Sequence, residues 1–569
     1  MGHNAESRRA RVRTPAPVGG QPLQLRGNPS TAPTPRNPPG FAGFTYLFQG
    51  SAPQLTPGIR NINNPAHDEI MRQLAQGLPC NATWRARLRT PSGASGTLDD
   101  NPFIPSGYTY LLQFIAHDVV QTTTPFWAAA DLGVDSANNR ACPLMLNALY
   151  GGGPSACPQA FEPPPGGEKN EDEDRIHLRL GSLAGSDHRG GRCPMRDLPR
   201  VNVDQGIPAT NRNSDSVNFE QAHSVQTADP RNDDNIILSQ MVVLLSLAHN
   251  IVCDQITNTR AEARFNYARA IMLDIYHRIV GHDLLPLLLH PHVLRVMAAK
   301  PVGLWTGSGI PLEFSHGALR VGHAMVRHSY SLNVGLRNQD IMKVVMHNQQ
   351  FAGGLRTPLE QRWILEWSRF FDDLGGVPNF SRRIGLRKSS LDRHDLFPTP
   401  GVSPPDGTSL RDLLSAAAAE LPSVAGMINA ITELHPALIP PGWNPAIPRR
   451  IGAGIQTWLQ TTPLAGNAAG LTSIVNNPPL PLFILAEAEF DPDVLGRHMG
   501  VLGSIIVGEV LYRLIDGERG RLSQLKAAAA NSFANGLLGE TDAIDSMSGL
   551  VEFVARFGNL DACHGIPFK

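Results

Sequence analysis

The sequence predicts a mainly α-helical protein in which one large domain carries long loops and few short strands. Apolar residues recur with the spacing of amphipathic helices along most of the chain, whereas the strict alternation that marks strands is rare and brief. Glycine and proline are abundant, with 54 and 48 residues, which favours long connections between the helices. The stretches with helical patterns are residues 67–78, 107–120, 234–280, 317–332, 358–372, 409–433, 482–515 and 543–556.

Residues 1–60 differ from the rest of the chain. They are rich in Pro, Gly, Arg and Asn with few periodic apolar positions, which predicts a flexible N-terminal arm. No linker composition or fixed-period repeat interrupts residues 61–569, so we expect them to form a single domain. Residues 1–20 contain no apolar core of a secretory signal. Apolar runs are broken before the ~20 residues that a bilayer span needs, so we expect a soluble chain.

Composition excludes several classes of partner. Apolar residues make up 41% and charged residues 17%, with a formal charge of −1, so neither nucleic acid nor an anionic membrane is expected as the main partner. The cysteines show no CxxC spacing, which argues against a zinc ribbon and against covalently attached c-type haem. They suit a reducing compartment as well as an oxidising one. The cysteines are Cys80, Cys142, Cys157, Cys193, Cys253 and Cys563.

The apolar stretch YLLQFIAHDVVQTT, residues 110–123, holds an imidazole beside a carboxylate. In a helix, Gln113 and His117 stand four residues apart and share a face, while Asp118 points roughly 100° away. One face could present an amide and a base to a small polar molecule. Alternatively, His117 is a core histidine with a partner and Asp118 faces solvent.

A second stretch, residues 227–256, predicts a long buried helix. Arg231, Asp233 and Asp234 precede it, and acidic residues suit the positive end of the helix dipole. His249 lies deep within the helix, where a hydrogen-bonded core histidine is the favoured interpretation.

Two shorter stretches carry polar residues at suggestive spacing. In GALRVGHAMVRHSY, Arg320 and His323 share a helical face, and Gly322 leaves room for a flat molecule beside the imidazole. In GGVPNFSRRIG, Asn379 and Arg382 follow a turn of small residues. Each stretch alone also fits ordinary core or loop packing.

The order of these pieces resembles the animal-type haem peroxidases of the peroxidase–cyclooxygenase superfamily, most closely their bacterial branch. The resemblance covers roughly residues 60–515 and includes NPFIPSGYTY before the first motif and LYGGGP at 149–154. The motifs that carry it are Gln113-Phe-Ile-Ala-His117-Asp118, Asp229-Pro-Arg231-Asn-Asp-Asp234, His249-Asn250, Arg320-Val-Gly-His323 and Asn379-Phe-Ser-Arg382.

The resemblance implies a haem peroxidase domain that binds haem b. His323 would ligate the iron, and Asn379 would accept its other ring N–H, which makes the ligand more electron-donating. Arg382 and Arg320 would pair with the haem propionates, because a guanidinium suits a carboxylate.

The resemblance also implies that hydrogen peroxide is reduced and a small electron donor is oxidised. His117 would take a proton from peroxide and return it to the departing oxygen, and Arg231 would stabilise the charge on that oxygen. Gln113 would hold a distal water or a small reductant. Whether the donor is a halide, thiocyanate or a phenol stays open.

Arginine at position 320 distinguishes activities within the superfamily. The cyclooxygenase and fatty-acid dioxygenase members carry a radical-forming tyrosine three residues before the proximal histidine, so Arg320 favours a peroxidase. A fatty-acid dioxygenase, with 282–305 lining a channel, and a haem-binding scaffold without activity are the alternatives. A metal-dependent hydrolase is disfavoured because no HExxH motif is present.

Calcium binding is doubtful. In the family Asp118 is one calcium ligand, and alignment on Tyr150 places the others at Ala141, Met145 and Asn147. A thioether is a poor ligand for a hard cation, so Asp118 and Asn147 would give a weak site or none.

Covalent attachment of the haem is also disfavoured. Family members form esters from two carboxylates, and the corresponding positions here are Ala116 and Asp234. Alanine cannot form an ester, and aspartate is one methylene shorter than the usual glutamate. Asn235 replaces the methionine of a sulfonium link, so we expect no covalent bond, with an Asp234 ester as the alternative.

Relatives are commonly exported although no export signal is visible here, so the compartment stays open, as does the oligomeric state.

Overall fold

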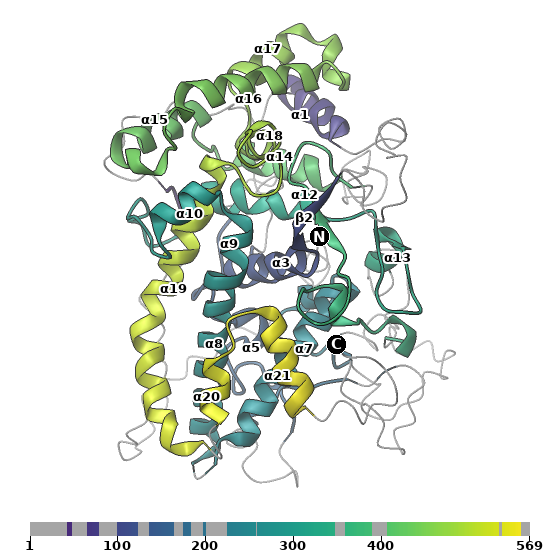
Figure 1. The fold of residues 1–569 in the computed structure, drawn as a ribbon, viewed down its shortest axis with the longest axis vertical. Coiled ribbons are helices and arrows are strands. Elements are labelled where there is room, and N and C mark those ends of the chain that lie inside the picture. The colour runs from purple at the N-terminus through teal and green to yellow at the C-terminus, as the bar shows by residue number, and fades with distance from the viewer. Residues whose placement is uncertain are drawn as a thin grey trace, which may run out of the picture.

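Helices make up most of the secondary structure in the computed structural model, as the sequence predicts (Figure 1). The extended segments are short, which confirms the predicted fold class. The structure describes residues 43–47, 65–78, 99–122, 136–163, 175–181, 183, 197–200, 225–257, 259–346, 359–389, 407–533 and 537–558.

The α-helices vary from single turns to one long helix at the side of the molecule (Figure 1). The longer ones are α1 (Pro65–Gly77), α3 (Gly107–Val119), α7 (Ile236–Gln255), α8 (Ala261–Arg278), α14 (Thr408–Ala418), α15 (Val424–Leu434), α16 (Trp443–Leu459), α17 (Ala468–Asn476), α18 (Leu480–Phe490), α19 (Val501–Ala529) and α21 (Met547–Phe557). The shorter ones are α5 (Asn147–Tyr150), α9 (Leu285–Leu288), α10 (Pro291–Met297), α11 (Leu312–Ser315), α12 (Gly322–Met325), α13 (Ile341–Met346) and α20 (Leu537–Asp542).

Short 3₁₀ turns and one π-helical segment connect these helices. The π-helix is η3 (Ile279–Leu284), which joins α8 to α9. The 3₁₀ turns are η1 (Pro158–Ala160), η2 (Pro230–Asp233), η4 (Ala318–Val321), η6 (Gln361–Trp363), η7 (Trp367–Arg369), η9 (Pro436–Leu438), η10 (Pro463–Gly466) and η11 (Ala530–Ser532).

The strands of the described residues form two-stranded pairs. β1 (Phe44–Thr45) pairs in parallel with β3 (Ile310–Pro311). β2 (Asp100–Pro105) pairs antiparallel with β6 (Phe380–Arg382). β4 (Ser329–Tyr330) pairs antiparallel with β5 (Gln339–Asp340).

Part of the predicted N-terminal arm belongs to the folded body. Most of residues 1–60 lie outside the described residues, but residues 43–47 include β1 and the fully buried Leu47. The Leu47 amide donates to the buried Glu313 carboxylate at 2.9 Å. The ordered domain therefore includes residues before position 61.

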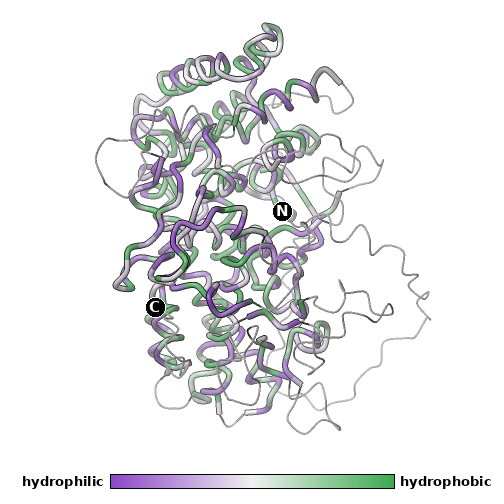
Figure 2. Tube along the Cα trace, turned by 90° about the vertical axis from the view of Figure 1, so that its right-hand side faces the viewer, coloured by the Kyte–Doolittle hydropathy of each residue, from purple (hydrophilic) through white to green (hydrophobic). Residues whose placement is uncertain are grey.

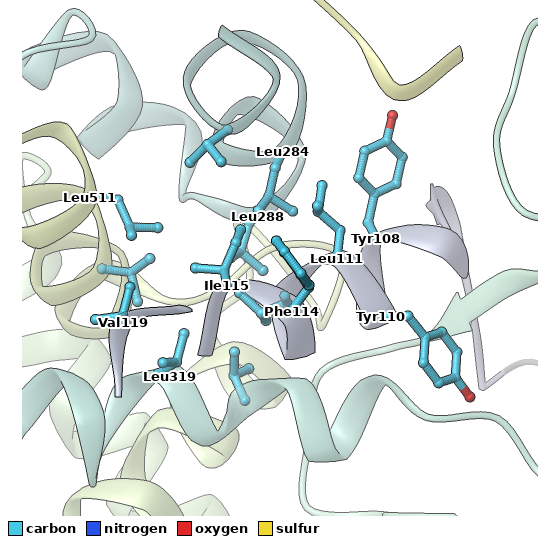
Figure 3. Packing of buried hydrophobic residues seen from close by; sticks show 14 of the residues in the cluster. Tyr108, Tyr110, Leu111, Phe114, Ile115, Val119, Leu284, Leu288, Leu319 and Leu511 are labelled. Atoms are coloured by element: carbon cyan, nitrogen blue, oxygen red, sulfur yellow. The ribbon is translucent and has the colours of Figure 1, made fainter. Parts of the chain in front are cut away.

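Helix α3 lies in the middle of the molecule and packs against α7 and α12 (Figure 1). Its apolar side chains group with Leu284, Leu288 and Leu511, which come from three other elements (Figure 3). Its first residue must be glycine, because a Cβ at Gly107 would lie 2.5 Å from the Phe370 carbonyl oxygen. This close approach fixes where α3 begins.

Helix α7 begins at a capped and paired turn. The Asn235 side chain accepts the Leu238 amide at 2.9 Å, which caps the helix. Asp233 pairs with the buried Arg200 through two nitrogen–oxygen contacts of 2.8 and 2.9 Å, which holds η2 in place.

α7 is long and apolar enough to cross a membrane, but 94% of its most apolar window is buried inside the protein, as in a core helix. Polar residues such as Ser239, Gln240 and Ser246 interrupt its apolar runs, as the sequence analysis describes.

Buried carboxylates hold the long helix α19 in place by accepting hydrogen bonds from backbone amides. Glu487 is fully buried and accepts the Leu502 and Gly503 amides at 2.8 and 3.1 Å, at the start of the helix. Burial raises the Glu487 pKa to about 8. Farther along, Glu509 accepts the amides of Val302, Gly303 and Trp305.

The helices at the upper end of the molecule, α15 to α17, show bands of both hydropathy colours, as expected where one face meets solvent (Figure 2).

Several predicted helices are shorter or divided. Residues 234–280 form α7 and α8, which are separated at 256–260. Residues 317–332 form only η4 and α12 before β4 begins, because the chain turns extended at Val326. Of the residues predicted as a helix at 358–372, those that the structure describes (359–372) form only the 3₁₀ turns η6 and η7, where Trp363, Trp367 and Phe370 are buried.

Candidate active site

The residues singled out in α3, η2 and α12 line one cavity with about 900 Å³ of empty space, part of it open to solvent. α3 contributes one group of side chains, and η4 with α12 contributes another. The cavity is lined by Thr109, Tyr110, Leu112, Gln113, Ala116, His117, Val120, Arg231, Asn235, Ser315, Leu319, Arg320, Gly322, His323 and Val326. Three of the five sequence motifs therefore meet in space although they lie far apart in the chain.

His117 presents a neutral imidazole to this cavity. It is buried, and its Nδ1 has no hydrogen-bond partner among the described residues. Burial, followed by the positive charge of Arg231, holds the His117 pKa well below its usual range. His117 can therefore act as a base near neutral pH.

The Arg231 guanidinium is fixed from several directions. Its Nε and one terminal nitrogen donate to Asp229, at 3.0 and 2.7 Å. The terminal nitrogens also donate to the carbonyls of His117 and Val120, both at 2.9 Å. These bonds tie the cation to α3 itself, so it keeps its position relative to His117.

Asp229 shares its carboxylate between two cations. It is fully buried and accepts hydrogen bonds from both Arg231 and Arg140. Burial alone would raise the Asp229 pKa, but the two guanidinium groups outweigh it and hold the pKa well below its usual range. Two positive charges and one negative charge leave a net positive charge beside the cavity.

Asp234 belongs to a polar network at the same end of the cavity. Its carboxylate accepts from Gln113 Nε2 at 3.4 Å and lies 3.8 Å from His117 Nε2. Asn235 donates to Gln113 Oε1 at 3.1 Å. Burial raises the Asp234 pKa to about 7. The shifts in the two pKa values have the same consequence, because each favours the uncharged form of its group.

His323 is held through Nδ1 by a carboxylate that the sequence analysis did not identify. Its Nδ1 lies 2.7 Å from Asp412 Oδ2, and Asp412 is on α14. The His323 side chain is 26% exposed and lines the cavity. Within the described part of the chain the ring forms no hydrogen bond at Nε2, so this nitrogen is the one left for a ligand.

The prediction that Asn379 accepts the His323 N–H was wrong. The Asn379 amide instead donates to the carbonyls of Ser331 and Arg369, at 2.9 and 2.7 Å, and accepts the Ser331 amide. Asn379 therefore fixes two loops to each other. Asp412, and not Asn379, pairs with the His323 imidazole.

Two cations surround the Asp412 carboxylate. Lys388 Nζ lies 3.5 Å from Oδ2, and Arg320 Nη1 lies 3.8 Å from Oδ1. Burial alone would raise the Asp412 pKa, but His323, Lys388 and Arg320 hold it well below its usual range. Asp412 is therefore an anion at neutral pH.

The two arginines expected at haem propionates differ in position. Arg320 lines the cavity, and its Nε also donates to the Ser315 carbonyl at 3.0 Å. Arg382 is 3% exposed, does not line the cavity, and donates to the Arg387 carbonyl at 2.9 Å. Its nearest carboxylate is Asp99, at 3.6 Å. This geometry leaves Arg320 as a propionate partner and gives no support to Arg382.

Asp118 does not face solvent but is fully buried and satisfied by backbone amides. It accepts from Leu146 and Ala148, both at 2.8 Å. Arg269 donates to the Asn147 side chain at 3.1 Å. A cationic side chain therefore lies beside a position that corresponds to a calcium ligand of the family. The Asp118 carboxylate and the Asn147 side chain therefore both form hydrogen bonds with other groups of the protein.

His249 is a core histidine, as the sequence analysis favoured. It is fully buried, with Nδ1 3.0 Å from the Tyr150 hydroxyl and Nε2 2.9 Å from the Ile176 carbonyl oxygen. Nε2 donates to the carbonyl, so Nδ1 accepts from the hydroxyl. Burial lowers the His249 pKa to about 4, so it stays neutral.

A second group of possible metal ligands lies outside the cavity. His290, Asp491 and Asp493 bring ligand atoms within 4.8 Å of one another. However, His290 Nδ1 accepts the His292 amide at 3.1 Å, which places the proton of a neutral ring on Nε2. With Nδ1 accepting the His292 amide and Nε2 protonated, the neutral ring offers no free lone pair to a metal ion, which disfavours metal binding.

Comparison with known proteins gives a family match over part of the chain. Residues 181–361 match the family model for animal haem peroxidase. The match spans 181 of the 569 residues, so the chain is similar to this family over that stretch. The matched residues include Arg231 and His323, whereas His117 lies before them. The match does not distinguish branches within the family, and no curated protein matches the chain.

A solved structure shares the fold at low sequence identity. The chain is similar to peroxidase A from Dictyostelium discoideum, with 14% identity, a TM-score of 0.52, and coverage of 89% of this chain and 95% of that chain. It is also similar to a fatty acid alpha-dioxygenase from Oryza sativa, with 14% identity, a TM-score of 0.45, and coverage of 90% and 82%. At these identities the first likeness shows the haem peroxidase fold alone, and the second carries no argument about activity.

Proposed function

We propose that this protein is a haem b peroxidase of the bacterial branch, which reduces hydrogen peroxide and oxidises a small electron donor. The observation that carries the proposal is the pairing of His323 Nδ1 with Asp412 at 2.7 Å beside the cavity that also contains His117 and Arg231. A histidine that ligates a metal almost always gives its other ring N–H to a carboxylate, carbonyl or water.

The cavity residues fit a haem. His323 offers Nε2 as the iron ligand, and Arg320 offers a cation for a propionate. Bound haem would supply an iron centre that accepts electrons from a donor and passes them to peroxide. Gly322 lines the cavity without a side chain, and a Cβ there would lie 3.3 Å from Leu112 Cδ2, so a larger residue would crowd this wall.

His117 is suited to move the peroxide proton. Its imidazole is buried, neutral and rigidly carried by α3, so it can accept a proton from one peroxide oxygen and donate it to the other. The Asp234–Gln113–Asn235 network holds polar groups next to this position. We assign Gln113 to hold a water or a small donor there.

Arg231 is suited to stabilise the departing oxygen. Its guanidinium lines the cavity and is fixed by Asp229 and by two carbonyls of α3. A preorganised cation in a site that excludes water stabilises developing negative charge without reorganisation. The net positive charge of the Arg140–Asp229–Arg231 group adds to this effect.

Arg320 favours a peroxidase over a fatty-acid dioxygenase. The dioxygenases have a radical-forming tyrosine at this position, whereas here a guanidinium pairs with Asp412. Because position 320 carries an arginine, it has no phenol that could form the radical with which lipid oxygenation begins.

Two substitutions test the proposal because they separate haem binding from peroxide activation. His323→Ala should abolish tight haem binding, whereas His117→Ala should keep the haem and react with peroxide about 10²–10⁴-fold more slowly. Stopped-flow absorbance after addition of peroxide measures the second effect. A His117→Ala protein that reacts as fast as wild type would show that His117 is not the base.

A further inference from the structure

The Asp412 carboxylate is shared between His323, the proposed iron ligand, and two cations. Its Oδ2 lies 2.7 Å from His323 Nδ1 and 3.5 Å from Lys388 Nζ, and its Oδ1 lies 3.8 Å from Arg320 Nη1. Asp412 is 4% exposed and Lys388 is 2% exposed, so these charges interact with little screening by water. His323 and Lys388 therefore compete for one carboxylate oxygen.

We propose that Asp412 is a positioning residue that sets the electron donation of His323 to the haem iron, and that Lys388 limits this donation. The inference rests on the proposed haem function. A full negative charge at Nδ1 draws the ring proton toward Asp412 and makes Nε2 a stronger donor than a neutral amide would. The Lys388 ammonium withdraws part of that charge because it contacts the same oxygen.

The position of Asp412 supports a role directed at His323. Asp412 lies on the buried side of α14 with Leu410 and Leu413, where a lone carboxylate is costly unless it is paired. The structure pairs it with His323 and two cations instead of excluding it. A carboxylate placed only for stability would need the cations but not the imidazole.

The test compares two substitutions that have opposite expected effects on the reduction potential of the iron. Asp412→Asn removes the charge at Nδ1, so the Fe(III)/Fe(II) midpoint should become more positive than in wild type. Lys388→Met removes the competing cation, so the midpoint should become more negative. Asp274→Asn, which alters an ion-paired carboxylate on α8, is the matched control and should leave the midpoint unchanged.

Porphyrin binding separates an effect on the iron ligand from general damage. Asp412→Asn should weaken haem binding by about 10–100-fold, while the affinity for metal-free protoporphyrin IX stays the same. An equal loss for both porphyrins would overturn the inference, because it would mean that Asp412 only shapes the cavity. An unchanged midpoint in Asp412→Asn, or shifts of the same sign in Asp412→Asn and Lys388→Met, would also overturn it.

A measurement on the haem-free protein keeps the inference testable if a variant loses haem. Nitrogen-15 NMR of labelled histidines, with His323→Gln for assignment, should show the His323 proton on Nδ1 in wild type. A proton on Nε2 would overturn the inference. Failure of the wild-type protein to take up haem would instead overturn the proposed function, and this NMR experiment distinguishes the two failures.

Discussion

Asp234→Asn should change how the stability of the haem-free protein depends on pH. Asp234 is 6% exposed, and burial raises its pKa from 3.8 to about 7. Between these values the folded protein keeps a proton that the unfolded chain has lost, so the free energy of unfolding decreases as pH rises through this window. An asparagine keeps the polar contact with Gln113 but cannot ionise.

The size of the effect follows from the shift in pKa. A rise of about 3 units corresponds to about 4 kcal/mol of destabilisation that is fully present above pH 7, since each unit is worth about 1.4 kcal/mol. About 3 kcal/mol of this develops between pH 5 and pH 8. Asp234→Asn should therefore gain stability relative to wild type by about 3 kcal/mol over that interval.

Urea denaturation of both haem-free proteins at about pH 5 and about pH 8 measures the difference. Asp274→Asn, which alters an ion-paired carboxylate away from the cavity, is the control for general charge effects. A stability difference between wild type and Asp234→Asn that is equal at both pH values would refute the reasoning, because burial would then not shift this carboxyl group.

Other perturbations have equally definite expected results. Arg231→Ala should keep haem and slow the reaction with peroxide by about 10²–10³-fold in stopped-flow experiments, and an unchanged rate would exclude its role. Dialysis against a chelator should leave no tightly bound calcium, because Asp118 already accepts two amides; one equivalent per chain by elemental analysis would contradict this. Acidified organic solvent should extract unmodified haem b, whereas haem that stays with the chain until Asp234→Ala releases it would establish the ester. Glu509→Ala should destabilise the fold by about 2–4 kcal/mol in urea, since three backbone amides, of which that of Trp305 is buried, lose their acceptor, and a loss below 1 kcal/mol would argue against that role.

The sequence predicts the elements that depend on local pattern. The helix expected at residues 107–120 is α3, residues 107–119, because its apolar spacing and its first glycine are local features. The spacing of Gln113 and His117 places both side chains in the cavity, and the buried character of α7 with His249 also follows from the sequence. These residues are positioned by the helix that contains them.

The sequence does not predict contacts between distant segments. Asp412 lies 89 residues after His323, and no periodicity relates the two positions. Its one local signal is an acidic residue on the apolar face of a helix, next to Leu413. The motif pointed to Asn379, but the amide of Asn379 is used by the loops at Ser331 and Arg369. The sequence likewise does not reveal that Asp229 fixes the Arg231 guanidinium.

An absorption titration of the purified protein with haem tests the central claim most directly. The account predicts a Soret band that saturates at one haem per chain and changes within seconds of adding hydrogen peroxide. The absence of a Soret band after reconstitution would contradict the assignment of His323, and a band that does not respond to peroxide would contradict the assignment of His117 and Arg231.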